Sequence, residues 1–114
     1  MSASFIFVNE RDAPSVAEQP TLEVGCWRVI EAADSHRHLL AVLDSGVVRI
    51  TSPLAGIGEE TGALITRSGR RYVLVCPPET REPQISLLLE NAARVGLAGF
   101  IDISESIWQS IRDA

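Results

Sequence analysis

A chain of 114 residues, 46% hydrophobic and 22% charged, has the composition of a single folded domain, residues 1–114, rather than of a disordered chain. At this length folding buries about two-thirds of the unfolded surface, so a core needs no metal or disulfide. The net charge of −5 argues against general binding to a phosphate backbone, because counterion release requires clustered cations. No apolar run approaches the roughly 20 residues that span a bilayer, and the start of the chain lacks a basic region. A cytoplasmic protein without a signal peptide is therefore expected.

The first elements in chain order are short runs of β-forming residues. Ser4–Val8 predicts an initial or edge strand, and the polar stretch Asn9–Pro20, which contains two prolines, predicts a loop. Thr21–Glu31 is rich in β-formers with partial alternation and predicts a second strand. Gly25 lies inside it, where a glycine marks a bulge or the close approach of another backbone.

Two hairpins with the same Ser-Gly turn follow. The first joins Leu39–Asp44 to Val47–Thr51, and the second joins Leu64–Arg67 to Arg70–Cys76. A Ser-Gly pair supplies the positive φ that a two-residue hairpin loop requires, so we expect two-residue loops in both hairpins.

The loop length fixes which residues face each other. With two-residue loops, Leu43 lies opposite Val48 on the core face of the first hairpin, and Leu64 lies opposite Val73 in the second. The stem of the second hairpin is then apolar on both faces. Such strands run through the middle of a sheet, so Arg70–Cys76 is predicted to be the central strand.

The connection Ser52–Gly62 contains three glycines and a proline, which predicts a flexible loop. After it and the second hairpin, apolar residues recur at helical spacing and predict a helix over about residues 83–95. Glu82 is its expected N-cap, Pro83 its first residue, and Gly96 lies just beyond its end.

The last part of the chain predicts one more strand and one more helix. The apolar run Phe100–Ile103 indicates the strand, and Ser104 is expected to cap a short C-terminal helix. All elements together predict an α+β fold: a mostly antiparallel sheet of five to seven short strands, one packed amphipathic helix (about 83–95) and a short C-terminal helix.

Positive charge is densest at the second hairpin turn, and all ten cations of the chain are arginines. Arg67 and Arg70 would face each other across that turn, which is unfavourable unless they are exposed or share an anion. The guanidinium fork matches carboxylate and phosphate groups. The sequence therefore gives a weak indication of a group of arginines that binds an anion or a protein partner. The alternative interpretation is a solvated, charged turn. The members of this group are Arg49, Arg67, Arg70 and Arg71, with Arg81 as a further neighbour.

Metal and catalytic motifs are missing from the sequence. His36 and His38 share one face of an extended segment, but no cysteine or histidine pair at structural-site spacing accompanies them. Cys26 and Cys76 lie in apolar runs and are expected to be free, buried thiols. No metal, cofactor or catalytic residue is predicted.

Two pairs of acidic residues and one glycine-rich piece are the remaining candidates for a catalytic or phosphate-binding motif. Glu59 and Glu60 lie in a loop, and Asp102 and Glu105 lie at a helix start, where carboxylates usually interact with the helix dipole. The glycine-rich piece lacks the lysine and the strand-to-helix setting of a phosphate-binding loop. An enzyme is therefore disfavoured.

These observations predict a small, non-enzymatic regulatory protein of bacterial or mobile-element origin. It would act as an inhibitor or accessory factor that docks on a protein partner, or it would self-associate along an exposed sheet edge. Trp108 is a candidate partner contact, with core packing as its alternative. The second hypothesis is nucleic-acid or phosphate-ligand binding through the Arg67/Arg70/Arg71 turn, which the acidic net charge disfavours. The third is an enzyme that uses His36, His38 and a carboxylate.

Overall fold

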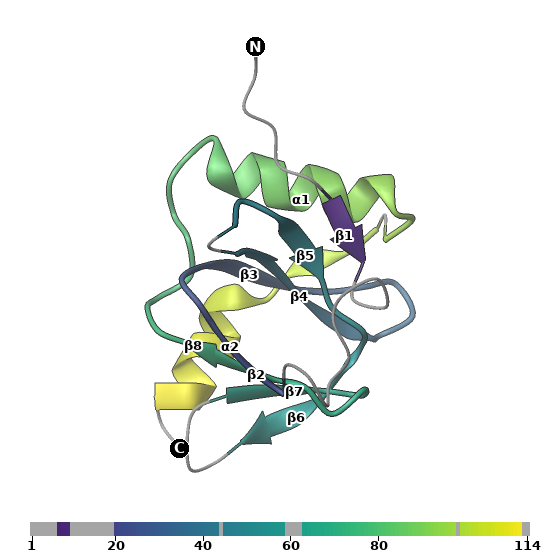
Figure 1. The fold of residues 1–114 in the computed structure, drawn as a ribbon. Coiled ribbons are helices and arrows are strands. Elements are labelled where there is room, and N and C mark those ends of the chain that lie inside the picture. Colours follow the sequence, from purple (N-terminus) through teal and green to yellow (C-terminus); the bar gives the residue numbers. More distant parts are fainter. Residues whose placement is uncertain (1–6, 10–19, 44, 59–62, 98, 113–114) are drawn as a thin grey trace.

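The computed structural model describes residues 7–9, 20–43, 45–58, 63–97 and 99–112, and Figure 1 shows how they are arranged. This part of the chain contains nine strands and two helices. The strands are β1 (Phe7–Asn9), β2 (Thr21–Val24), β3 (Cys26–Glu31), β4 (Arg37–Val42), β5 (Val48–Ile50), β6 (Leu54–Gly58), β7 (Ala63–Thr66), β8 (Arg71–Leu74) and β9 (Ile101–Asp102), and the helices are α1 (Gln84–Arg94) and α2 (Ser104–Arg112).

The strands form two sheets. Sheet A has the order β1-β5-β4-β3-β9, and sheet B has the order β2-β8-β7-β6. Strands β1 and β2 pair in parallel with β5 and β8, and the other pairings are antiparallel. The predicted α+β class, with mostly antiparallel pairing, one packed helix and a short C-terminal helix, is confirmed. Where one sheet of five to seven strands was expected, the described strands are divided between two sheets.

The chain passes between the sheets at short interruptions. Gly25 separates β2 in sheet B from β3 in sheet A, so the glycine expected to mark a bulge marks a change of sheet. Ser52 and Pro53 separate β5 in sheet A from β6 in sheet B, and a proline cannot donate to a strand ladder. Each sheet is therefore built from segments far apart in the sequence.

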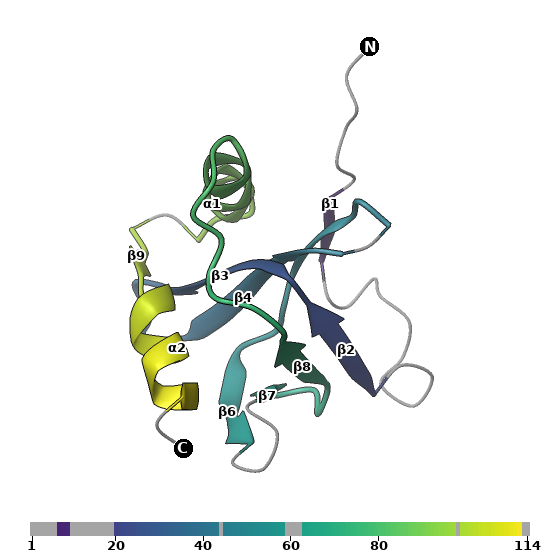
Figure 2. The ribbon, with the colours of Figure 1, turned by 90° about the vertical axis from the view of Figure 1, so that its left-hand side faces the viewer.

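Figure 2 shows the layers: α1 lies over sheet A, sheet B lies under it, and α2 runs along one side. Alternate residues of a strand point to opposite faces, so β3 and β4 of sheet A each contribute to two hydrophobic clusters. The buried members of the cluster between the sheets include Trp27, Val29, Leu39, Leu64, Tyr72 and Ile107 of α2. The cluster under α1 is formed by Ile30, Leu40, Val48, Ile50, Leu88 and Ala92.

The first hairpin has a three-residue loop instead of the expected two. The Leu43 N–H donates to the Val47 carbonyl at 2.8 Å, and the loop ends at Gly46, whose φ is +86°. A third loop residue with positive φ is common in hairpins, and glycine adopts it without strain. The longer loop shifts the register by one, so Val48 pairs with Val42 and not with Leu43.

The second hairpin shows the same correction. Its loop glycine has a φ of +97°, and the Thr66 N–H donates to the Arg70 carbonyl at 2.9 Å. Leu64 consequently pairs with Tyr72 and not with Val73. The expected interior position of the return strand is confirmed, because β8 lies between β2 and β7.

Two expectations concern the segments next to undescribed residues. The predicted strand Ser4–Val8 is represented by β1 at the edge of sheet A, while residues 1–6 and 10–19 lie outside the described residues. The expected flexible connection Ser52–Gly62 contains strand β6, so that prediction is wrong over Leu54–Gly58, and residues 59–62 are not described.

Helix α1 begins and ends close to the expected residues. It starts at Gln84 with Pro83 as its N-cap, one residue later than predicted, after a cis Glu82–Pro83 peptide. At its end Gly96 has a φ of +91°, and the N–H groups of Gly96 and Leu97 donate to carbonyls of the last turn at 3.1 Å. This pair of bonds is the Schellman arrangement for which a glycine beyond the last turn is favoured.

Candidate functional site

The arginines predicted to form a binding group do not gather at the hairpin tip. Arg67 is exposed in the loop, and Arg71 is partly buried at the start of β8. Arg70 is only 1% exposed, and Arg49 is only 4% exposed. The prediction that Arg67 and Arg70 face each other across the turn is wrong, because the three-residue loop places Thr66 opposite Arg70.

Arg49 lies on β5, between β1 and β4. It alternates with Val48 and Ile50, which pack under α1, so its side chain is on the face toward sheet B. Its Nε and Nη1 atoms are buried and have no hydrogen-bond partner among the described residues. Because arginine stays protonated and a buried, unpaired charge is costly, this position is suited to an anion.

Arg28 on β3 is, by contrast, fully paired. Its Nε donates to Asp102 at 2.9 Å, and its two Nη atoms donate to the two carboxylate oxygens of Glu105 at 3.2 Å. Nη1 also donates to the Glu79 carbonyl at 2.8 Å, and the side chain is 10% exposed. Arg28 thus connects β3 to β9, to the first turn of α2 and to the segment before α1. The Asp102 and Glu105 carboxylates neutralise this guanidinium.

Ser104, the expected cap of the last helix, has another role. It is the first residue of α2, and its hydroxyl accepts a hydrogen bond from the Val29 N–H at 2.8 Å and donates to Asp102 Oδ1 at 2.6 Å. The Asp102 carboxylate also accepts the Ser104 N–H at 3.0 Å. Burial would raise the pKa of Asp102, but the hydrogen bonds from Arg28 and Ser104 outweigh it and lower that pKa. We call these contacts of Arg28 and Ser104 the sealed end.

Glu79 and Cys26 form a second polar contact beside the sealed end. The Glu79 carboxylate, 6% exposed, accepts hydrogen bonds from the Arg81 Nε and backbone N–H, both at 3.0 Å. These bonds lower the pKa of Glu79 from 4.5 to about 2. Burial, together with a hydrogen bond to Glu79, raises the pKa of the Cys26 thiol to about 12. Cys26 therefore stays a thiol at neutral pH and is a poor nucleophile.

The two tryptophans contact each other inside the molecule. Trp27 has no exposed surface, and its Nε1 donates to the Cys76 carbonyl at 2.9 Å. Its ring centre lies 6.1 Å from that of Trp108, with an angle of 52° between the planes. Trp108 is partly buried and packs on the cluster between the sheets. A contact of Trp108 with a partner stays a prediction.

The two histidines have separate hydrogen-bond partners. His36 Nδ1 lies 3.1 Å from a carboxylate oxygen of Asp34, and His38 Nδ1 lies 2.9 Å from the Thr51 carbonyl. Among the described residues, no three His, Cys, Asp or Glu side chains are close enough together to hold a metal ion. Cys26 and Cys76 are both free thiols.

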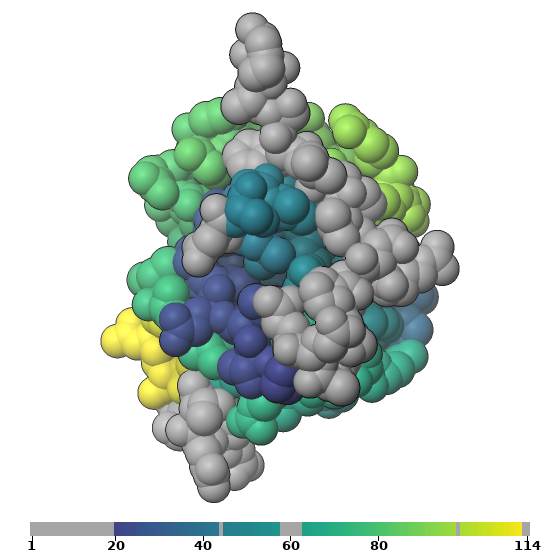
Figure 3. All heavy atoms as spheres, viewed as in Figure 1, coloured from purple at the N-terminus to yellow at the C-terminus, as the bar shows by residue number. Residues whose placement is uncertain are grey.

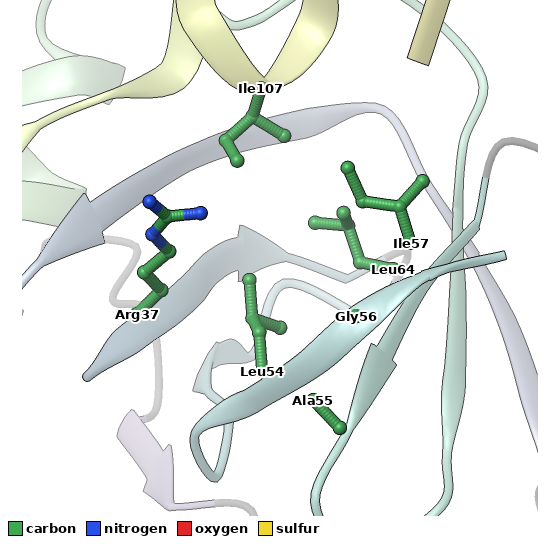
Figure 4. A pocket seen from close by; sticks show the side chains of 7 residues that line it. All are labelled: Arg37, Leu54, Ala55, Gly56, Ile57, Leu64 and Ile107. Atoms are coloured by element: carbon green, nitrogen blue, oxygen red, sulfur yellow. The ribbon is translucent and has the colours of Figure 1, made fainter. Parts of the chain in front are cut away.

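An open hollow lies between the start of β4, strand β6 and helix α2 (Figure 4). It encloses about 100 Å³ and is apolar except for one side chain. We call it the β6 groove, and its lining residues are Arg37, Leu54, Ala55, Gly56, Ile57, Leu64 and Ile107.

A bulge in β6 shapes the floor of this groove. Leu54 pairs with Thr66 and Ile57 pairs with Leu64, and the register is irregular between Leu54 and Gly56. The extra residue lets Leu54 and Ile57, three positions apart, both turn toward the interior, where they pack on the cluster between the sheets. Ala55 and Gly56 are left exposed.

Arg37 supplies the only charge in the lining. Its Nε donates to Glu31 at 3.1 Å, and its side chain is 54% exposed. The two Nη atoms make no hydrogen bond or ion pair with the described residues. Figure 4 shows the guanidinium end at the rim of the hollow, on the side of Ile107. The groove therefore combines an apolar hollow with an available cationic fork.

The sequence pattern does not point to this groove. Gly56 and Gly58 are typical of a loop, and the three-residue spacing of Leu54 and Ile57 does not fit one face of an uninterrupted strand. The available signal was an uncharged apolar segment, Leu54–Gly58, directly after Pro53.

No protein-family model, no curated protein and no solved structure matches this chain. Neither α1 nor α2 is long and apolar enough to cross a membrane, and the described residues contain no other helix.

Proposed function

We propose that this protein is a small interaction module that binds an extended segment of a protein partner along β6. The observation that carries the proposal is the combination of an edge strand and an open groove: β6 pairs with β7 on one side only, and the β6 groove lies beside it. An extended peptide can add to such an edge through main-chain hydrogen bonds, while pockets select its side chains.

The other edges are less suited to this role. Strand β2, which reaches the surface in Figure 3, follows Pro20 and carries the exposed carboxylate Glu23. Strands β1 and β9, the two edges of sheet A, are only three and two residues long. Charges, prolines and short length are the usual protection of an edge against pairing, and the β6 segment Leu54–Gly58 contains no charge.

The shape of β6 favours a foreign segment over a second copy of this chain. Pro53 precedes the strand, and the bulge at its start leaves only Gly56–Gly58 in regular register with β7. Two such short edges would share few hydrogen bonds in a symmetric dimer. A foreign peptide gains additional contact from a side chain placed in the β6 groove. Docking of this kind supports a role as an inhibitor or accessory factor of its partner.

Hydrogen–deuterium exchange during a screen of random hexapeptides tests the proposal. Peptides that bind are expected to slow exchange at the β6 amides. The exchange rate of the β2 amides should not change, so these amides serve as the internal control. Sedimentation of the same samples reports self-association. Protection confined to β2 or to the hairpin tip, or a stable dimer that excludes peptide, would contradict the proposal.

A second candidate, anion binding, is favoured by one observation: the buried Arg49 with two unpaired nitrogens. Phosphate or a nucleic-acid phosphate would neutralise it, and Arg67 at the exposed loop would contribute to a polyanion. Titration with phosphate and with a DNA duplex, at low and high salt, tests this candidate. Binding is expected to weaken with salt and in Arg49→Met and Arg67→Ala variants. Binding that is absent or insensitive to salt would exclude it.

A further inference from the structure

The β6 groove has room for one side chain of limited size. An engineered apolar cavity of about 150 Å³ accepts a benzene molecule. The groove encloses about 100 Å³ and is walled by Leu54, Ile57 and Ile107, so a branched aliphatic side chain fits better than an aromatic ring. Arg37 at the rim is the only lining residue with a polar side chain, so a polar side chain in the hollow would lose hydration without gaining a hydrogen bond to a neighbouring side chain there.

The cation at the rim adds a second requirement. Arg37 is held by Glu31 through Nε, which orients the guanidinium, and both Nη atoms are without a partner among the described residues. A carboxylate accepts two parallel hydrogen bonds from such a fork. Because Arg37 itself lines the hollow, the carboxylate of a bound peptide must lie close to the side chain that fills it.

The geometry of an extended peptide decides where this carboxylate comes from. Successive side chains of a strand point to opposite faces, so an Asp or Glu next to the aliphatic residue would point away from the groove. An acidic residue two positions away on the same face would be displaced by about 7 Å along the strand. The α-carboxylate of a C-terminal residue, in contrast, belongs to the same residue as the inserted side chain.

We infer that the β6 groove recognises the C-terminus of a partner protein, with a terminal Val, Leu or Ile side chain in the hollow and its α-carboxylate on Arg37. The inference rests on the proposed peptide binding along β6 and names the chemistry of the segment that is bound. The residues that precede the terminal one continue along the edge of β6 beside Ala55 and Gly56, which are exposed.

Two pools of random hexapeptides that end in Leu, one with a free carboxylate and one amidated, test this inference. The acid pool is expected to yield ligands whose affinity falls about tenfold or more on amidation, because a charge-assisted bond is lost. The same ligands should lose a similar factor with the Arg37→Gln variant. The matched control is Arg94→Gln, which removes the same charge from an exposed position on α1, across sheet A from the groove, and should leave affinity unchanged. A terminal Leu→Phe change in the peptide should also weaken binding.

The outcomes separate this inference from the proposed function. Equal binding of acid and amide, with no effect of Arg37→Gln, overturns C-terminal recognition while binding along β6 stands. Binding by neither pool, nor by unbiased hexapeptides, overturns both. The comparison of acid with amide uses the unaltered protein, so it holds even if a variant folds poorly.

Discussion

The sealed end and the β6 groove each contain an arginine, on the neighbouring strands β3 and β4, and the two arginines have opposite surroundings. Arg28 on β3 donates to two carboxylates and a carbonyl, and 10% of its side chain is exposed. Arg37 on β4 has one carboxylate partner on Nε and is 54% exposed. A guanidinium whose three nitrogens all donate within the fold stabilises it, whereas one whose Nη atoms have no partner among the described residues can bind a ligand beside a hollow.

The contrast also shows that the polar residues around the sealed end interact with one another within the fold. The acids and the thiol of this region that have a clearly shifted pKa are Asp102, Glu79 and Cys26. Their shifts have structural causes, namely ion pairs and burial between elements. The groove, in contrast, is mostly apolar, and the features that suit it to binding are its shape and the guanidinium of Arg37.

Removing the central cation of the sealed end should have the largest effect. An Arg28→Leu variant removes the donor to Asp102 Oδ2 and to the Glu79 carbonyl, and we expect the free energy of unfolding to fall by about 3 kcal/mol. Urea titration followed by the fluorescence of Trp27 and Trp108 measures this. An Arg94→Leu control, at an exposed position on α1, should change stability by less than about 0.5 kcal/mol. Equal effects of both substitutions would refute a special role for Arg28.

A Glu79→Gln variant should have the next largest effect, and the effect should depend on pH. At pH 7 the loss of charge-assisted bonds to Arg81 should cost about 1.5 kcal/mol. The pKa of Glu79 is lowered from 4.5 to about 2, so its contribution is complete above pH 4.5 and is lost as pH falls toward 2. The difference in stability between the two proteins should therefore shrink over this range. A difference that is constant with pH would contradict the assignment.

A Ser104→Ala variant should have a smaller effect. It removes the acceptor of the buried Val29 N–H and one donor to Asp102, for an expected loss of about 1 kcal/mol. The matched control is Ser110→Ala, because that hydroxyl is exposed and bonds only within its own helix. Thermal unfolding of both variants measures the difference, and a neutral Ser104→Ala would show that water replaces the hydroxyl.

The smallest effect on stability is expected at the groove. Arg37→Gln removes an exposed ion pair with Glu31, and such pairs contribute little, so the free energy of unfolding should change by less than about 0.5 kcal/mol. The same variant should lose peptide affinity as described above. A large destabilisation would show that Arg37, like Arg28, stabilises the fold, and would remove the distinction between the two regions.

Much of the fold could be predicted from local patterns. The helix over residues 84–94 and the glycine beyond it follow from apolar spacing and from φ preferences, which act within a few residues. The hairpins were predicted at the right places, but their loops were one residue too short, because a Ser-Gly pair fits both two- and three-residue loops. The sequence alone does not distinguish the two loop lengths. A change of one residue in loop length shifts the register by one, which places different residues on the same face of the paired strands.

The candidate site depends on contacts between distant segments and could not be predicted. The groove brings together Arg37, β6 and Ile107 of α2, whose positions are related only by the packing of two sheets. The division of Thr21–Glu31 between sheets at Gly25 also depends on where other strands lie. The burial of Arg49 and Arg70 could not be foreseen, because charged side chains are mostly exposed.

The contacts of β3 bear on the order in which the chain folds. Three consecutive residues, Trp27, Arg28 and Val29, have side-chain or backbone partners 49 to 77 residues further along the sequence. A native structure with such distant contacts folds slowly, since a large loop must close before any of them forms. We therefore expect β3 and β4 to pair early as a local hairpin and β3 to acquire its remaining partners only when the C-terminal helix has docked. Helix α2, the last described element, would then complete the surroundings of one of the first strands.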